Sequence, residues 1–147
     1  MTVPRFIEMR IIKTTILLAL LLYASVRDIK TREVPDSISV MLLILGLVDT
    51  DIVRLPLMLF GALLVFLPQF ASALINPSKA LGGADIKVSS SAAFLLGTPN
   101  GLFALIFGLT LAVIVMPIIR RSRKLPKDQP LPLIPFLSIG IIAGYFI

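Results

Sequence analysis

The sequence predicts an all-α protein, a polytopic membrane helix bundle of about six transmembrane helices that forms a single domain over residues 1–147. Hydrophobic residues make up 57% of the 147-residue chain, and its mean hydropathy is +1.01. A soluble domain of this size cannot bury that much apolar surface. The apolar residues also fall into runs separated by charged or proline-containing stretches. Much of the surface is therefore expected to face lipid.

Six stretches account for the expected helices. Four are strongly apolar and come close to the roughly 20 residues that cross a bilayer: 11–26, 55–75, 101–119 and 131–147. Two weaker stretches lie between them. Residues 37–48 form a short segment, and residues 86–98 contain three consecutive serines. Short polar helices are better buried inside a bundle than exposed to lipid, so we expect both in its interior. The proline-rich residues 126–135 are expected to form a hinge into the last helix.

Basic residues predict the orientation. The stretches 27–36, 76–87 and 120–130 hold ten of the 14 lysines and arginines: Arg27, Lys30, Arg32, Lys79, Lys87, Arg120, Arg121, Arg123, Lys124 and Lys127. The positive-inside rule places these three stretches in the cytoplasm and both termini outside, in a multi-pass protein of the inner (cytoplasmic) cell membrane. The net charge of +6 is then explained by orientation and by contact with anionic lipid, and no nucleic-acid partner is expected.

The residue types that are absent restrict the chemistry. The chain has neither cysteine nor histidine, which excludes disulfides, thiolate zinc sites, cysteine nucleophiles and serine–histidine dyads. No metal site and no cofactor are therefore predicted. Any acid–base chemistry must come from carboxylates, lysine or tyrosine with shifted pKa values.

Two aspartates lie at the same expected membrane boundary. Asp28 directly follows the first helix, and Asp85 directly precedes the segment 86–98. Each alone is explained as a helix cap or boundary residue, because aspartate readily accepts hydrogen bonds from free N–H groups at a helix start. Brought together, two carboxylates share one proton, and such a pair can hydrolyse a peptide bond without a metal. The sequence leaves both explanations open for each residue taken singly.

Three motifs resemble those of one family, the type IV prepilin peptidases with the related archaeal preflagellin peptidases. DIKTREVPD (residues 28–36) resembles its first aspartate motif, and GGADIK (residues 82–87) its second. LPLIPFLSIG (residues 131–140) resembles its C-terminal Pro-x-x-Pro-Phe-Leu-x-x-Gly signature. The motifs occur in the family's order and cover nearly the whole chain. One position of the second motif, Ala84, is glycine in the stricter pattern, which affects the subfamily more than the activity.

The resemblance implies an intramembrane aspartic endopeptidase of type IV pilus, protein secretion or archaeal filament systems. It would cut the short basic leader from pilin, pseudopilin or archaellin precursors at the cytoplasmic face, usually after a glycine. Asp28 and Asp85 would be the catalytic dyad that activates water, and Gly82 and Gly83 would shape the substrate approach. The protein resembles a short form without the N-terminal cysteine region, so N-methyltransferase activity is not expected.

Several further residues have competing explanations. Asp36, in Val-Pro-Asp-Ser, is expected to cap the helix 37–48, with a supporting substrate-binding role as the alternative. Lys87 is expected to extend to the membrane interface, or else to tune the dyad. The three serines, Ser89, Ser90 and Ser91, are expected to hydrogen-bond between helices. For the protein as a whole, the alternative function is that of a small membrane transporter that uses its aspartates for proton or cation coupling.

Overall fold

The computed structural model describes residues 3–78 and 81–147, and the regular structure in these residues is helical. The predicted all-α class is confirmed. Six α-helices follow one another, with a 3-10 turn, η1 (Ile52–Arg54), before the third. They are α1 (Val3–Thr31), α2 (Asp36–Leu47), α3 (Leu55–Ile75), α4 (Gly83–Leu96), α5 (Thr98–Ser122) and α6 (Ile134–Phe146).

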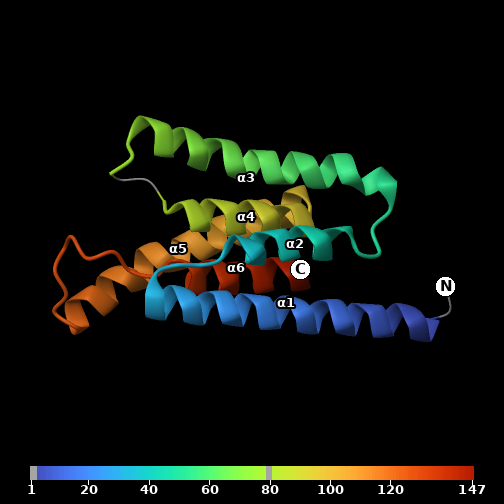
Figure 1. The fold of residues 1–147 in the computed structure, drawn as a ribbon, viewed down its shortest axis with the longest axis horizontal. Coiled ribbons are helices and arrows are strands. Elements are labelled where there is room, and N and C mark those ends of the chain that lie inside the picture. The colour runs from blue at the N-terminus through green and yellow to red at the C-terminus, as the bar shows by residue number, and fades with distance from the viewer. Residues whose placement is uncertain (1–2, 79–80) are drawn as a thin grey trace.

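The helices run in alternating directions through the bundle (Figure 1). As a result, α1, α3 and α5 end on the side where α2, α4 and α6 begin, and the chain's two ends point the other way. The three stretches rich in lysine and arginine connect these helices, so they gather at one end of the bundle, which we call the basic end. Lys79 lies outside the described residues. This shared end is what the positive-inside argument requires.

Three helices are long and apolar enough to cross a membrane: Ile7–Thr31, Ile52–Ile75 and Thr98–Ser122. The stretch 131–147, expected as a fourth strong span, differs. Its helix covers only Ile134–Phe146, or about 20 Å at 1.5 Å per residue, against a hydrocarbon core of about 30 Å. Pro135 explains the late start, because a helix that began at residue 131 would need the N–H of residue 135 for an i→i−4 hydrogen bond, and proline has none. Pro135 is tolerated in the first turn of α6, as the predicted hinge requires.

The helix α4 is the centre of the bundle and packs against α2, α3, α5 and α6. Eight of its 14 residues are buried, among them Ser89 and Ser91. This confirms that the serine-containing segment is an interior helix. It ends at Gly97, whose φ of 79° is a conformation that favours glycine.

The helices α5 and α6 pack at very close range through glycines. A Cβ atom added to Gly140 would collide with the backbone carbonyl oxygen of Ala104 and lie 2.8 Å from the backbone nitrogen of Gly108. A Cβ atom on Gly144 would lie 2.7 Å from the carbonyl oxygen of Asn100. Small residues permit such backbone contact between helices in a membrane protein. This packing holds α6 against α5, and the start of α6 contacts the site described next.

Candidate active site

Asp28 lies on the buried face of α1. The residues that point from this helix into the bundle are Leu17, Leu21 and Ala24, and their spacing of four and three residues continues four residues later to Asp28. An apolar stripe with this spacing follows one face of a helix. Asp28 is therefore carried into the interior by the same periodicity that buries the leucines, and only 8% of it remains exposed.

The buried carboxylate of Asp28 is satisfied by the start of α6. The backbone N–H of Ile134 donates a hydrogen bond of 2.9 Å to Asp28 Oδ2. Ile134 is the first residue of α6, where N–H groups have no partner within the helix and the helix dipole favours a negative charge. The motifs at residues 131–140 and 28–36 are thus in direct contact through this hydrogen bond.

Asp85 lies in the first turn of α4 and is partly buried. Its Oδ2 accepts a hydrogen bond of 3.2 Å from the backbone N–H of Gly82, the N-cap residue of the helix. This is one half of a capping box, and the reciprocal half is missing because glycine has no side chain. Asp85 thus accepts a backbone N–H at the start of its helix, as expected of a boundary residue, but the N-cap position itself is Gly82. One hydrogen bond leaves the carboxyl capacity for further partners.

Both aspartates line one cavity of about 450 Å³ at the basic end. Its walls come from α1, the start of α4, α5 and the segment that precedes α6; the other lining residues are Arg32, Leu81, Gly82, Met116, Pro130, Leu131 and Leu133. Four parts of the chain that are distant in sequence thus converge on two carboxyl groups and a mostly apolar wall. Such a cavity has room for a short piece of extended peptide and for water.

The electrostatics of the cavity favour a shared proton. Asp85 lies outside the three candidate membrane spans. Burial, and after it the negative charge of Asp28, raise the pKa of the Asp85 carboxyl from 3.8 to about 6, against the opposing effect of the Gly82 N–H. Two neighbouring carboxylates resist simultaneous ionisation, so Asp85 tends to keep a proton while Asp28 is negative.

Two arginines hold the segment that covers the cavity. Arg32 donates from Nη1 to the carbonyl oxygen of Pro130, and Arg120 donates from Nη2 to the carbonyl oxygen of Gln129 at 2.9 Å. Arg32 also lines the cavity and adopts a positive φ of 57°, which is uncommon for a residue other than glycine. Charge patterns along the sequence identify both arginines only as orientation signals, since they do not reveal which carbonyl oxygen a guanidinium contacts.

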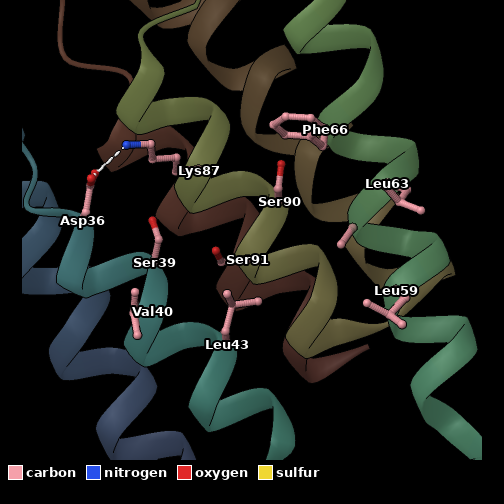
Figure 2. A pocket seen from close by; sticks show the side chains of 11 residues that line it. Asp36, Ser39, Val40, Leu43, Leu59, Leu63, Phe66, Lys87, Ser90 and Ser91 are labelled. Atoms are coloured by element: carbon pink, nitrogen blue, oxygen red, sulfur yellow. Dashed lines mark hydrogen bonds and ion pairs between the residues drawn. The ribbon is translucent and has the colours of Figure 1, made fainter.

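Asp36 and Lys87 form an ion pair away from the two aspartates. The Lys87 Nζ lies 2.8 Å from Asp36 Oδ1 and 2.9 Å from Oδ2, as Figure 2 shows. A helix starts here as expected, but it begins at Asp36 and not at residue 37, so the expected cap is wrong. Pro35 is the N-cap residue and makes no side-chain cap, because the helix begins one residue earlier than predicted. Lys87 is therefore held by Asp36 at the surface.

The three serines have different partners. Ser89 exchanges hydrogen bonds with the buried Gln69 of α3, at 3.1 and 3.2 Å, which confirms the expected bonding between helices. The Ser90 hydroxyl instead donates a hydrogen bond of 2.7 Å to the carbonyl oxygen of Ile86 in its own helix. The predicted hydrogen bond between helices is therefore wrong for Ser90. No hydrogen bond is found for the Ser91 hydroxyl within the part of the chain that the structure describes.

Gly82 and Gly83 lie at the opening of α4. A Cβ atom added to Gly82 would lie 3.0 Å from Asp85 Oδ2, whereas one added to Gly83 would meet nothing within 4 Å. Gly82 thus allows the carboxylate to fold back against the backbone. Among the described residues, no atom comes within 4 Å of the position of a Gly83 Cβ, so the start of α4 is uncovered at this point.

Comparison with known proteins adds one finding. A family model with the description "Type IV leader peptidase family" matches residues 15–118. This range contains both aspartates of the cavity and both glycines at the start of α4, and it ends before α6. No curated protein and no solved structure matches the chain.

Proposed function

The chain belongs to the type IV leader peptidase family, and from this premise we propose that it is an intramembrane aspartic endopeptidase. It removes the short basic leader from pilin-like precursors, such as pilins, pseudopilins or archaellins, at the cytoplasmic face of the membrane and usually after a glycine. The observation that carries this proposal is the cavity that Asp28 and Asp85 line together. The basic end of the bundle is the cytoplasmic end in this proposal.

The proposed mechanism gives the two aspartates different tasks. Asp28, ionised and stabilised by the Ile134 N–H, accepts a proton from water on its other oxygen. That water attacks the scissile carbonyl carbon while Asp85 donates its proton to the carbonyl oxygen. In the second step the C–N bond breaks, the new amine takes the proton from Asp28, and the carbonyl re-forms as Asp85 recovers its proton. The dyad is then ready for another cycle.

The transporter alternative has less support. Proton or cation coupling in membrane proteins typically uses acids inside the membrane, on a pathway between its two sides. Asp28 and Asp85 instead lie near helix ends at the basic end, and each accepts a backbone N–H. Membership in a peptidase family favours hydrolysis.

Co-expression with a pilin-like precursor tests the proposed function. We expect a faster-migrating product whose mass corresponds to removal of the leader, and sequencing of its N-terminus should place the cut at the junction between leader and hydrophobic helix. A cut inside the helix, or no product when both proteins are inserted in the same membrane, would contradict the proposal.

The rate of cleavage is expected to fall as the pH rises through about 6, because Asp85 then loses the proton that it donates. The stability of the folded protein is expected to change in the same direction as the cleavage rate. Between 3.8 and about 6 the folded protein binds more protons than the unfolded chain, so the free energy of unfolding also falls as the pH rises through this window. Initial rates and unfolding measured across this range in detergent check both. A rate that increases across it would refute the assignment of the proton donor.

Gly82→Ala is expected to lower kcat by about tenfold, because the new Cβ displaces the Asp85 carboxylate by a few tenths of an ångström and catalysis depends on such positioning. The Cβ would start only 3.0 Å from Oδ2. Steady-state cleavage of the precursor measures the effect. Ser78→Ala, at an exposed position of the same connection, is the control and should leave kcat unchanged. An unaltered kcat in Gly82→Ala would show that the fit against Oδ2 does not matter.

A further inference from the structure

A groove of about 430 Å³ lies along α4 between α2 and α3. Both outer helices pack on α4, and within the described residues they do not pack on each other, so this face of α4 stays open. Figure 2 shows the arrangement. Residues from all three helices line the groove: Asp36, Ser39, Val40, Leu43, Leu59, Ala62, Leu63, Phe66, Lys87, Ser90 and Ser91.

The floor of the groove carries two largely buried serines, Ser39 and Ser91, whose hydroxyl groups open into it. Ser39 is 8% exposed and Ser91 is 6% exposed, and both line the groove. No hydrogen bond of either hydroxyl is found within the described residues, whereas the neighbouring Ser90 bonds to its own helix. Buried polar groups normally have a partner. The hydroxyls of Ser39 and Ser91 are not fully enclosed by the protein, so they are free to pair with an occupant that brings polar groups to an otherwise apolar groove.

The rim of the groove faces the lipid. Val40 is 52% exposed, Leu59 is 54% exposed and Leu63 is 51% exposed, and α3 is one of the candidate membrane spans. An occupant must therefore enter sideways from the bilayer. The floor and wall also present the small residues Ser39, Ser91 and Ala62, which allow another helix to approach its neighbours closely.

One end of the groove lies at the basic end of the bundle, where the two aspartates also lie. The ion pair of Asp36 and Lys87 stands at the basic end, and Lys87 is only two residues from Asp85. Successive residues of a helix turn by about 100°, so Asp85 and Lys87 point to opposite sides of α4. A chain that leaves the groove at Lys87 reaches Asp85 by passing over the start of α4, where no atom of the described residues comes within 4 Å of the position of a Gly83 Cβ.

We propose that this groove binds the hydrophobic helix of the precursor, which rests on the proposed function. The helix lies against the floor of α4 with a face of small or hydroxyl-bearing residues that pair with Ser39 and Ser91. Its N-terminal end emerges at the ion pair of Asp36 and Lys87, at the same end of the bundle as Asp28 and Asp85. The junction between leader and helix then crosses Gly83 to the cavity of Asp28 and Asp85.

The test uses a model precursor with a lysine-containing leader that ends in glycine, followed by an apolar helix of about 20 residues. The chain has no native cysteine, so any cross-link to it must form at the single cysteine that is introduced. Ser90→Cys is combined with Asp85→Asn, which prevents cleavage and so keeps the precursor intact. The introduced cysteine is then cross-linked to a cysteine in the precursor helix. Ala71→Cys is the control. Ala71 is exposed on the same helix as Ala62, and nine residues away it points about 180° from it.

A second arm measures cleavage in protein that retains Asp85. Ala62→Trp fills the groove, and we expect kcat/KM for the precursor to fall by about tenfold or more through KM, since overpacking excludes the helix. Ala71→Trp should leave it unchanged. A truncated precursor that ends shortly after the cleavage junction should be cut equally by Ala62→Trp and the unsubstituted protein, because it does not use the groove.

Each combination of results decides a different point. Cross-linking from Ser90 but not from Ala71, together with the Ala62→Trp effect, supports the groove. Equal cross-linking from both positions, or normal cleavage by Ala62→Trp, overturns it, and the groove then holds only lipid chains. If the unsubstituted protein cuts the precursor and Ser90 gives no cross-link, the docking inference fails and the proposed function stands. If the cross-link forms and no cleavage occurs, the proposed function fails and docking stands.

Discussion

Replacing either Asp28 or Asp85 by asparagine is expected to lower precursor cleavage by about 10²–10⁴-fold, the usual contribution of a positioned general acid or base. Asparagine keeps nearly the same shape but neither accepts nor donates a proton at neutral pH. Its amide oxygen can still accept the N–H of Ile134 or of Gly82, the partners of the two aspartates. The variants should therefore fold and insert while the chemistry is lost.

Initial rates of leader removal measure the effect, with unfolding in detergent as the check on folding. Asp128→Asn is the matched control, since Asp128 is exposed in the connection that covers the same end of the bundle. It makes the same chemical change and should retain the normal rate. If one of the two dyad variants processed precursor at the normal rate, that aspartate would have no part in the reaction. Normal processing by the double variant would refute the aspartic mechanism altogether.

Gly140→Ala is expected to have the largest effect on stability. Its Cβ would collide with the Ala104 carbonyl oxygen and approach the Gly108 backbone to 2.8 Å, and backbone atoms cannot rotate away as a side chain can. Alanine favours a helix over glycine by about 1 kcal/mol, which partly offsets the clash. We expect a net loss of about 1–3 kcal/mol in the free energy of unfolding, as in other overpacked interiors.

The same substitution should also reduce cleavage, because separating α6 from α5 moves Ile134 away from Asp28. Denaturant unfolding and cleavage rates on one preparation measure both effects. Gly83→Ala is the control for stability, as an added Cβ there meets nothing within 4 Å. A Gly140→Ala protein that unfolds at the same denaturant concentration as the unsubstituted one would show that α5 and α6 can readily separate.

Much of the site was predictable because hydropathy and charge determine where each helix ends. The alternation of six helices brings residues 28 and 85 to the same end, and the spacing of Leu17, Leu21 and Ala24 turns Asp28 inward. The burial of residues 86–98 followed from their length and polarity. These features depend on periodicity along one segment, which a single sequence contains.

The remaining parts depend on contacts between distant segments. Nothing local indicates that the Ile134 N–H meets Asp28, that Met116 and Leu131 line the same cavity, or that Asp36 pairs with Lys87. The predicted cap at Asp36 failed by one residue, since Val-Pro-Asp-Ser is compatible with a helix start at either position. The last helix was predicted too long because hydropathy averages over Pro135, whose missing N–H excludes a helix that begins at residue 131.

The hydrogen bond from Ile134 to Asp28 has a consequence for biosynthesis. The two residues are 106 positions apart, so ribosomes finish α1 through α5 well before the partner of the Asp28 carboxylate exists. During that interval the nascent chain must keep Asp28 hydrated or protonated, because a buried charge without a partner is costly. The Asp28 carboxylate therefore gains its backbone hydrogen bond only when α6 inserts. The newly made protein has its full candidate site only at that late stage.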